Sequence, residues 1–175
     1  MVRPDIECQL VEKTIIFLEM PMPTTDELLT TARQRGQNDH LPYAGAVTPG
    51  EAFALLQADV ATILVDVRTN AERDWVGRVS IRDPQHAAVQ WSQYPGGVQN
   101  PDFLAQLAQI AEKGTPLLFL CRSGVRSQHA AKLATENGYA NCFNILEGFE
   151  GDKDNNGHRK NLNGWCKAGL PWLGA

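Results

Sequence analysis

A short loop around Cys121 holds the residues best suited to chemistry. It consists of Cys121, Arg122, Ser123, Gly124, Val125, Arg126 and Ser127. A loop that leads from a strand into a helix points backbone N–H groups inward, and this nest, backed by the helix dipole, binds anions. Gly124 permits the unusual backbone angles that such a nest needs, and Arg122 and Arg126 add positive charge. Together these features favour the nucleophilic thiolate of Cys121 over the thiol, although an isolated cysteine at a strand end is ordinarily only a small apolar residue.

The segments on either side must place this loop at the end of a buried strand. Residues 117–120 form a continuous apolar run, and an alanine-rich helix is predicted after the loop, ending at Gly138. Strands are predicted at 63–67, 87–91, 117–120 and 142–146, and helices at 24–36, 48–56, 103–111 and 128–137. This alternation predicts an α/β fold with a mostly parallel central sheet and helices on both faces. Ligands of such sheets bind beyond the carboxyl ends of the strands.

Two capping boxes mark the start of helices, Thr24 with Glu27 and Thr48 with Glu51. We interpret residues 1–45 as an N-terminal extension with a short helix and residues 46–175 as the main domain. The first twenty residues show no clean periodicity. One hypothesis is that they are a dispensable leader, or that Met1 is not the native start.

The motifs of the main domain resemble those of the rhodanese-like sulfurtransferases, whose nucleophilic cysteine opens a Cys-Arg-Ser-Gly-x-Arg-Ser loop. The early family signature is similar to Leu64-Val65-Asp66-Val67-Arg68, Glu72 and Gly77-Arg78-Val79, with Arg78 where histidine is usual. The closing signature is similar to Leu146-Glu147-Gly148-Phe149, Gly164-Trp165 and Gly169-Leu170-Pro171. The resemblance covers residues 47–172 and implies a single rhodanese-like domain.

The resemblance implies a ping-pong transfer of sulfane sulfur in which Cys121 is the catalytic residue and becomes a persulfide. The implied substrate-binding residues are Arg122, Ser123, Gly124, Val125, Arg126 and Ser127. Arg122 and Arg126 would hold an anionic leaving group, but an ion pair of Arg126 with Asp66 or Glu72 that shapes the loop is an equal alternative. We expect Asp66 and Arg68 to support the loop structurally.

The implied partners are a small anionic sulfur donor such as thiosulfate and an acceptor such as cyanide or a thiol, with a protein sulfur carrier as a further candidate. No cofactor and no metal ion are expected. Two rivals stay open. Cysteine-dependent phosphatases place five residues between nucleophile and arginine, whereas four separate Cys121 from Arg126 here. A non-catalytic binding or regulatory module is the other rival, and the presence of Cys121 argues against it.

The segment 150–163 contains Asp152-x-Asp154-x-Asn156-Gly157, which matches the first half of a calcium loop. Because Asn163 occupies the twelfth position in place of glutamate, we interpret the segment as a solvated turn. A lid is the alternative, in which His158, Arg159 and Lys160 attract the anionic donor.

Composition excludes several classes of protein. Sixteen Lys and Arg against twenty Asp and Glu give a net charge of −4 over 175 residues, which argues against nucleic acid and anionic membranes as partners. No apolar run is long enough to span a bilayer. Beside Cys121, the other three cysteines, Cys8, Cys142 and Cys166, are too scattered for a disulfide scaffold and are expected to be bystanders. The sequence predicts a cytoplasmic protein.

Overall fold

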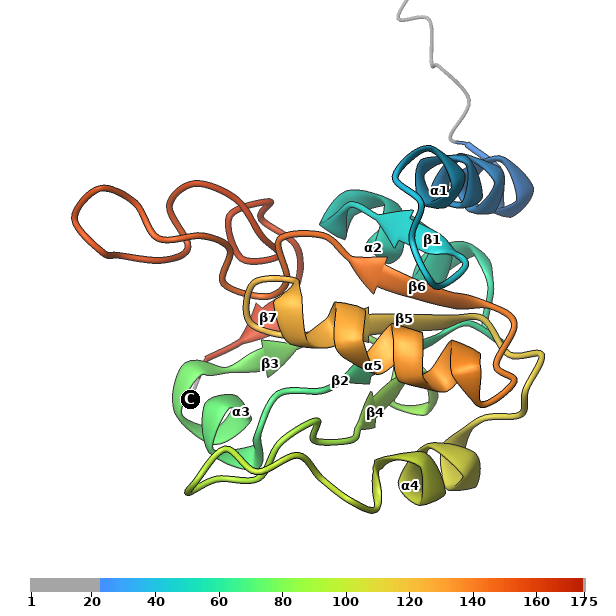
Figure 1. The fold of residues 1–175 in the computed structure, drawn as a ribbon. Coiled ribbons are helices and arrows are strands. Elements are labelled where there is room, and N and C mark those ends of the chain that lie inside the picture. Colours follow the sequence, from blue (N-terminus) through green and yellow to red (C-terminus); the bar gives the residue numbers. More distant parts are fainter. Residues whose placement is uncertain (1–22, 175) are drawn as a thin grey trace, which may run out of the picture.

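The strands of the chain build a five-stranded parallel sheet, as seen in a computed structural model that describes residues 23–174 (Figure 1). The strand order is β1-β6-β5-β2-β4, and each neighbouring pair is parallel. The strands are β1 (Gly45–Val47), β2 (Ile63–Asp66), β4 (His86–Ala88), β5 (Leu117–Leu120) and β6 (Cys142–Ile145). The predicted α/β fold with a parallel central sheet is therefore confirmed, and β5 lies in the middle of the sheet.

Helices cover both faces of this sheet, as predicted. They are α1 (Thr25–Asn38), α2 (Pro49–Ala58), α3 (Asn70–Val76), α4 (Phe103–Ile110) and α5 (Val125–Glu136). Successive residues of a strand point to opposite faces, so the side chains of β5 pack into two separate cores. Leu118 packs in one core with Leu55 of α2. Phe119 packs in the other with Phe103 of α4 and Ala131 of α5.

The capping boxes begin their helices where the sequence places them. Thr24 and Thr48 each cap a helix through the reciprocal bonds with Glu27 and Glu51. A third box, formed by Thr69 and Glu72, starts α3. α5 begins at Val125, three residues before the predicted start, because Gly124 at φ +91° serves as its N-cap. The loop after Cys121 is therefore shorter and lies directly at the helix end.

The parallel register brings several distant segments to one edge of the sheet. Asp66 pairs with Leu120 at the carboxyl ends of β2 and β5, and the Val67 N–H donates to the Leu120 carbonyl over 2.8 Å. The segment after β6 folds back over the same edge, since the Phe149 N–H donates to the Cys121 carbonyl over 2.8 Å. The residues after β2, β5 and β6 thus meet around Cys121.

Besides α3, which was not among the predicted helices, two strand features of the fold were not predicted from the sequence. The edge strand β1 is only three residues of small and β-branched type. The second is the antiparallel pair of β3 (Arg78–Val79) and β7 (Trp172–Leu173), with the short 3₁₀ helix η1 (Asp83–Gln85) following β3. Each depends on pairing with a distant segment, which a local pattern does not reveal.

Part of the predicted N-terminal extension contributes to the core. Leu28 and Ala32 of α1 are buried in the same cluster as the α2 side chains, and the backbone of Gly45 lies so close to the Ala32 carbonyl that a Cβ would have no room. The domain boundary at residue 46 stays a prediction. The predictions about Cys8 and about Met1 fall outside the described residues. Between residues 23 and 174, no helix is long and apolar enough to cross a membrane.

Candidate functional site

Cys121 follows the central strand β5 and is almost completely buried, with 1% of its surface exposed. Its sulfur lies against two hydrogen-bond donors of the following turn. The Gly124 N–H lies 3.1 Å from Sγ, and the Ser127 hydroxyl lies 3.2 Å from it. Two donors aimed at one sulfur, together with the positive end of a 12-residue helix, favour a negative charge on that atom.

Arg126 is not an unpaired cation beside the Cys121 sulfur. Its guanidinium forms a two-pronged ion pair with Glu72 of α3, at 2.6 and 2.8 Å. Burial opposes ionisation of Glu72, but hydrogen bonds from Arg126 and from the Thr69 N–H outweigh it and lower the pKa of Glu72. The hydrogen bond to Glu72 likewise raises the pKa of Arg126. Of the two roles open to Arg126 from sequence, the ion pair with Glu72 is present in the structure.

The remaining loop residues differ in exposure. Arg122 is exposed, and among the described residues no carboxylate lies within ion-pair distance of it. Ser123 is half-buried and Val125 is 58% exposed. The Arg122 carbonyl accepts hydrogen bonds from the N–H groups of Glu150 and Gly151. The backbone of the loop is therefore held in place while the Arg122 side chain faces solvent as a cation.

Asp66 and Arg68 form a buried ion pair behind the loop. Both side chains are 0% exposed, and the closest N–O distance is 2.7 Å. Burial disfavours the Asp66 carboxylate, yet a contact with His86 and the charge of Arg68 hold its pKa well below the ordinary value. The Arg68 guanidinium lies 4.0 Å from the ring centre of Phe149, the residue whose N–H binds the Cys121 carbonyl. The pair thus contacts the segment that holds the loop.

Gly148 lies directly against the backbone of the Cys121 loop. It has φ +65°, and a Cβ on this residue would lie 2.5 Å from the Cys121 carbonyl oxygen and 2.7 Å from the Ser123 nitrogen. Real Cβ atoms do not approach backbone atoms so closely. Only glycine therefore lets the segment after β6 pack against the loop at this point.

Replacing Gly148 by alanine is expected to lower the free energy of unfolding by about 2 kcal/mol or more and to slow alkylation of Cys121, because either the loop or the 148 segment must move. Gly169→Ala is the matched control, since Gly169 has a similar φ of +69° with nothing within 4 Å of its Cβ position. The control should lose only about 1 to 2 kcal/mol of backbone strain and keep the alkylation rate. Urea unfolding and peptide mass spectrometry measure both quantities; equal effects of the two variants would refute the close packing.

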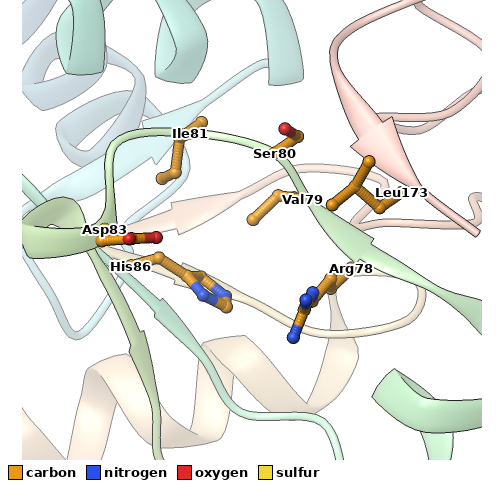
Figure 2. A pocket seen from close by; sticks show the side chains of 7 residues that line it. All are labelled: Arg78, Val79, Ser80, Ile81, Asp83, His86 and Leu173. Atoms are coloured by element: carbon orange, nitrogen blue, oxygen red, sulfur yellow. The ribbon is translucent and has the colours of Figure 1, made fainter.

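A separate cavity of about 180 Å³ lies beside β3 and does not include Cys121 in its lining. Figure 2 shows Asp83 and His86 on one side of it and Arg78 and Leu173 on the other. His86 Nε2 lies 3.9 Å from Asp66 Oδ2. The cavity therefore adjoins the buried ion pair, whereas the Cys121 sulfur lies in the loop that follows β5.

The calcium-like motif of the 150–163 segment closes a turn. Asp154 Oδ1 accepts hydrogen bonds from the N–H groups of Asn156 and His158, at 2.9 and 2.8 Å, and Oδ2 accepts one from Asn161 at 2.8 Å. These bonds lower the pKa of Asp154, with the Asn161 amide as the largest cause. Among residues 23–174, no group of three or more His, Cys, Asp or Glu side chains is arranged to share a metal ion.

Of the predicted lid residues, two are tied into their surroundings. Arg159 donates a hydrogen bond to the Gly151 carbonyl, and the Lys160 ammonium lies 4.4 Å from the ring centre of Trp172. His158 is exposed, with Asp154 as its neighbour. Arg159 and Lys160 keep their positive charges in these contacts, and the lid hypothesis stays a prediction.

The two other described cysteines have environments that disfavour the thiolate. Burial raises the pKa of Cys142 in β6 to about 11. Burial also raises the pKa of Cys166, which is half-buried. The Thr135 hydroxyl partly opposes the shift at Cys142, but among the described residues neither sulfur accepts a hydrogen bond from a backbone N–H as Cys121 does.

Two residues near the loop were not assigned a role from the sequence. Gly148 was noted as part of a motif, but its contact with the Cys121 carbonyl is visible only in the fold. Asn144 lies inside a predicted strand and was given no role there. In the structure it is 0% exposed and close to Gly124. A polar residue in the middle of a buried strand is the signal that could have identified Asn144.

Residues 44–175 match the protein family described as "STR4 middle domain". An uncharacterized protein of Rickettsia conorii, RC0915, is 34% identical over 125 residues, which cover 70% of this chain and 91% of that protein. The thiosulfate sulfurtransferase GlpE of Haemophilus influenzae is 30% identical over 125 residues, covering 71% of this chain and 90% of that protein.

The fold is also similar to solved structures. The crystal structure of Rv0390 from M. tuberculosis has a TM-score of 0.69 at 41% sequence identity, and the match covers 76% of this chain and 99% of that one. The polysulfide-sulfur transferase homodimer from Wolinella succinogenes has a TM-score of 0.53 at 19% identity, covering 88% and 95% of the two chains. This second likeness concerns the fold alone.

Proposed function

The chain belongs to the rhodanese-like sulfurtransferase family, and from this premise we propose that it moves sulfane sulfur from a small anionic donor such as thiosulfate to a cyanide or thiol acceptor. The intermediate is a persulfide on Cys121. The observation that carries the proposal is the pair of donors at the sulfur, the Gly124 N–H at 3.1 Å and the Ser127 hydroxyl at 3.2 Å. A thiolate held in this way needs no general base.

The reaction has two steps that regenerate the enzyme. In the first, the Cys121 thiolate attacks the outer sulfur of thiosulfate, the sulfur–sulfur bond of the donor breaks, and sulfite leaves with the bonding electron pair. In the second, cyanide attacks the outer sulfur of the persulfide, the new sulfur–sulfur bond breaks, and thiocyanate leaves while Cys121 returns to the thiolate. No proton has to be transferred and no cofactor takes part.

We assign the loop residues different roles in binding. The outer sulfur of a persulfide is itself an anion, and we assign the backbone N–H groups of residues 122–127 to the nest that would hold it, of which the Gly124 N–H already faces Cys121 Sγ. Arg122 is the exposed cation that we assign to the departing sulfite. Arg126 is engaged by Glu72, so we assign it chiefly to the shape and positive potential of the nest. Asp66 and Arg68 support the loop from behind.

The exposure of the loop residues supports the proposed partners. Val125 and Arg122 are exposed beside a buried sulfur, so a small anion, a thiol or the cysteine of a protein sulfur carrier can all reach the rim of the loop. We propose the cytoplasm as the location, because Cys121, Cys142 and Cys166 are all free thiols.

Intact mass spectrometry tests the proposal. Incubation with thiosulfate is expected to add one sulfur atom to the protein, cyanide is expected to remove it, and peptide mapping should place it on Cys121. A protein that gains no sulfur from thiosulfate, polysulfide or a thiol persulfide would refute the proposal. An assay with an aryl phosphate separates this activity from that of a phosphatase, since release of phosphate by Cys121 would favour the rival function.

A further inference from the structure

Asn144 is a buried polar residue for which the proposed reaction has no use. Its side chain is 0% exposed, and neither Nδ2 nor Oδ1 has a hydrogen-bond partner among the described residues. An unpaired buried amide is unfavourable, and most proteins pair such groups. The position of this amide therefore calls for a physical explanation.

The amide lies beneath the first turn of α5. In β6, Asn144 points to the same face as Cys142, which packs against α5 residues. Its neighbour in register on β5 is Phe119, two residues before Cys121. A Cβ placed on Gly124 would lie 3.9 Å from Asn144 Nδ2. Asn144 thus lies next to the glycine whose N–H binds the reactive sulfur.

The Ser127 hydroxyl, beside Gly124, carries one hydrogen but lies within reach of two acceptors. Its oxygen lies 3.2 Å from Cys121 Sγ and 3.0 Å from the Gly124 carbonyl. A charged acceptor forms the stronger hydrogen bond, so ionisation of Cys121 draws this hydrogen to the sulfur. The Gly124 carbonyl then keeps only a long bond from the Gln128 N–H, at 3.4 Å.

We propose that Asn144 is a positioning residue that supplies the missing donor. When the Ser127 hydroxyl turns to the charged sulfur, the Asn144 amide turns its N–H toward the Gly124 carbonyl. This rotation breaks no existing hydrogen bond, because neither amide atom has a partner among the described residues. The amide therefore stabilises the charged sulfur relative to the neutral thiol, acting through Gly124 and Ser127.

The charged groups around the sulfur are accounted for separately. Arg126 of α5 is paired with Glu72 of α3, and Asp66 and Arg68 at the end of β2 are paired with each other. Arg122 is exposed in the loop itself, and the Glu147 carboxylate after β6 accepts a hydrogen bond from a backbone N–H. A change at Asn144 leaves these six charges in place, so a shift in the ionisation of Cys121 in the variant reports the loss of the hydrogen-bond exchange.

The test measures the alkylation rate of Cys121 by iodoacetamide as a function of pH, followed by peptide mass spectrometry. Asn144→Leu is expected to slow alkylation about fivefold at neutral pH and to move the midpoint of the profile to higher pH, the effect of losing about one hydrogen bond. Its melting temperature should stay equal or rise, because the variant removes an unpaired amide. A purely structural role would lower the melting temperature as well.

Two further variants ensure that the experiment can support or refute the role of Asn144. Asn144→Ser retains a donor and should keep the midpoint nearer to that of the wild type than Asn144→Ala does, even if leucine does not fit. Cys142→Val, on the same strand and face but two residues from Asn144, should leave the profile unchanged. Identical profiles for Asn144→Ala, Asn144→Ser and the wild type would overturn the proposal.

The inference deepens the proposed function and rests on it, but the two can fail separately. Alkylation requires only the Cys121 thiol and no sulfur donor. If the protein forms no persulfide while the Asn144 variants shift the profile, the proposed function fails and the positioning role holds. If the persulfide forms and the profiles coincide, the positioning role alone fails.

Discussion

Replacing Cys121 by serine is expected to lower the rate of thiocyanate formation from thiosulfate and cyanide at least about a thousandfold. The substitution changes one atom and keeps the buried position, but a serine hydroxyl does not ionise near neutral pH and cannot form a persulfide. Colorimetric measurement of thiocyanate determines the rate, and circular dichroism shows whether the variant is folded.

Cys166→Ser is the matched control for this prediction. Cys166 is half-buried, and burial raises its thiol pKa, so we expect the control to retain most of the wild-type rate. The assignment of the nucleophile would be wrong if Cys121→Ser kept its activity, or if Cys166→Ser lost it while remaining folded.

Replacing Asp66 by asparagine is expected to lower the free energy of unfolding by about 3 to 5 kcal/mol at neutral pH. Asp66 and Arg68 are both 0% exposed, so the variant leaves the Arg68 cation buried without its counter-charge. Urea unfolding of the two proteins measures the difference. Asp66→Asn combined with Arg68→Met removes both charges and should recover part of the loss; a single variant as stable as the wild type would contradict the buried pair.

The pH dependence of this difference has a definite sign. The pKa of Asp66 in the folded protein lies below its ordinary value, through the contacts with His86 and Arg68 that outweigh burial. The carboxylate therefore contributes its full stabilisation above the unfolded pKa of about 3.9, and this contribution is lost as the pH falls further toward the folded pKa. The gap between wild type and Asp66→Asn should be constant above about pH 5 and shrink below about pH 4.

Local sequence patterns correctly predicted several helices and strands of the fold that holds the loop. The capping boxes at Thr24 and Thr48 begin α1 and α2, and the apolar run 117–120 is strand β5. These features depend on residues a few positions apart, so the sequence displays them directly. The start of α5 was placed three residues late, because Gly124 at φ +91° acts as the N-cap without a side chain, and propensity alone does not reveal such a cap.

The partners of the loop residues were harder to predict. Sequence analysis left Arg126 with a choice of Asp66, Glu72 or substrate, and the structure pairs it with Glu72, 54 positions away along the chain. Asp66 instead forms an ion pair with Arg68. Which carboxylate meets which arginine depends on how α3 and β2 are placed relative to α5, and no local pattern carries that information.

The sequence by itself determined the alternation of strands and helices that supports the loop, and it carried the chemistry that we propose for the loop, because both depend on residues that are neighbours in the chain. The tertiary structure alone decided that Gly148 touches the Cys121 carbonyl and that the Asn144 amide lies beneath Gly124. Both contacts arise from the register of β6 beside β5. That register is set by the packing of two cores, so it exists only once the whole sheet has formed.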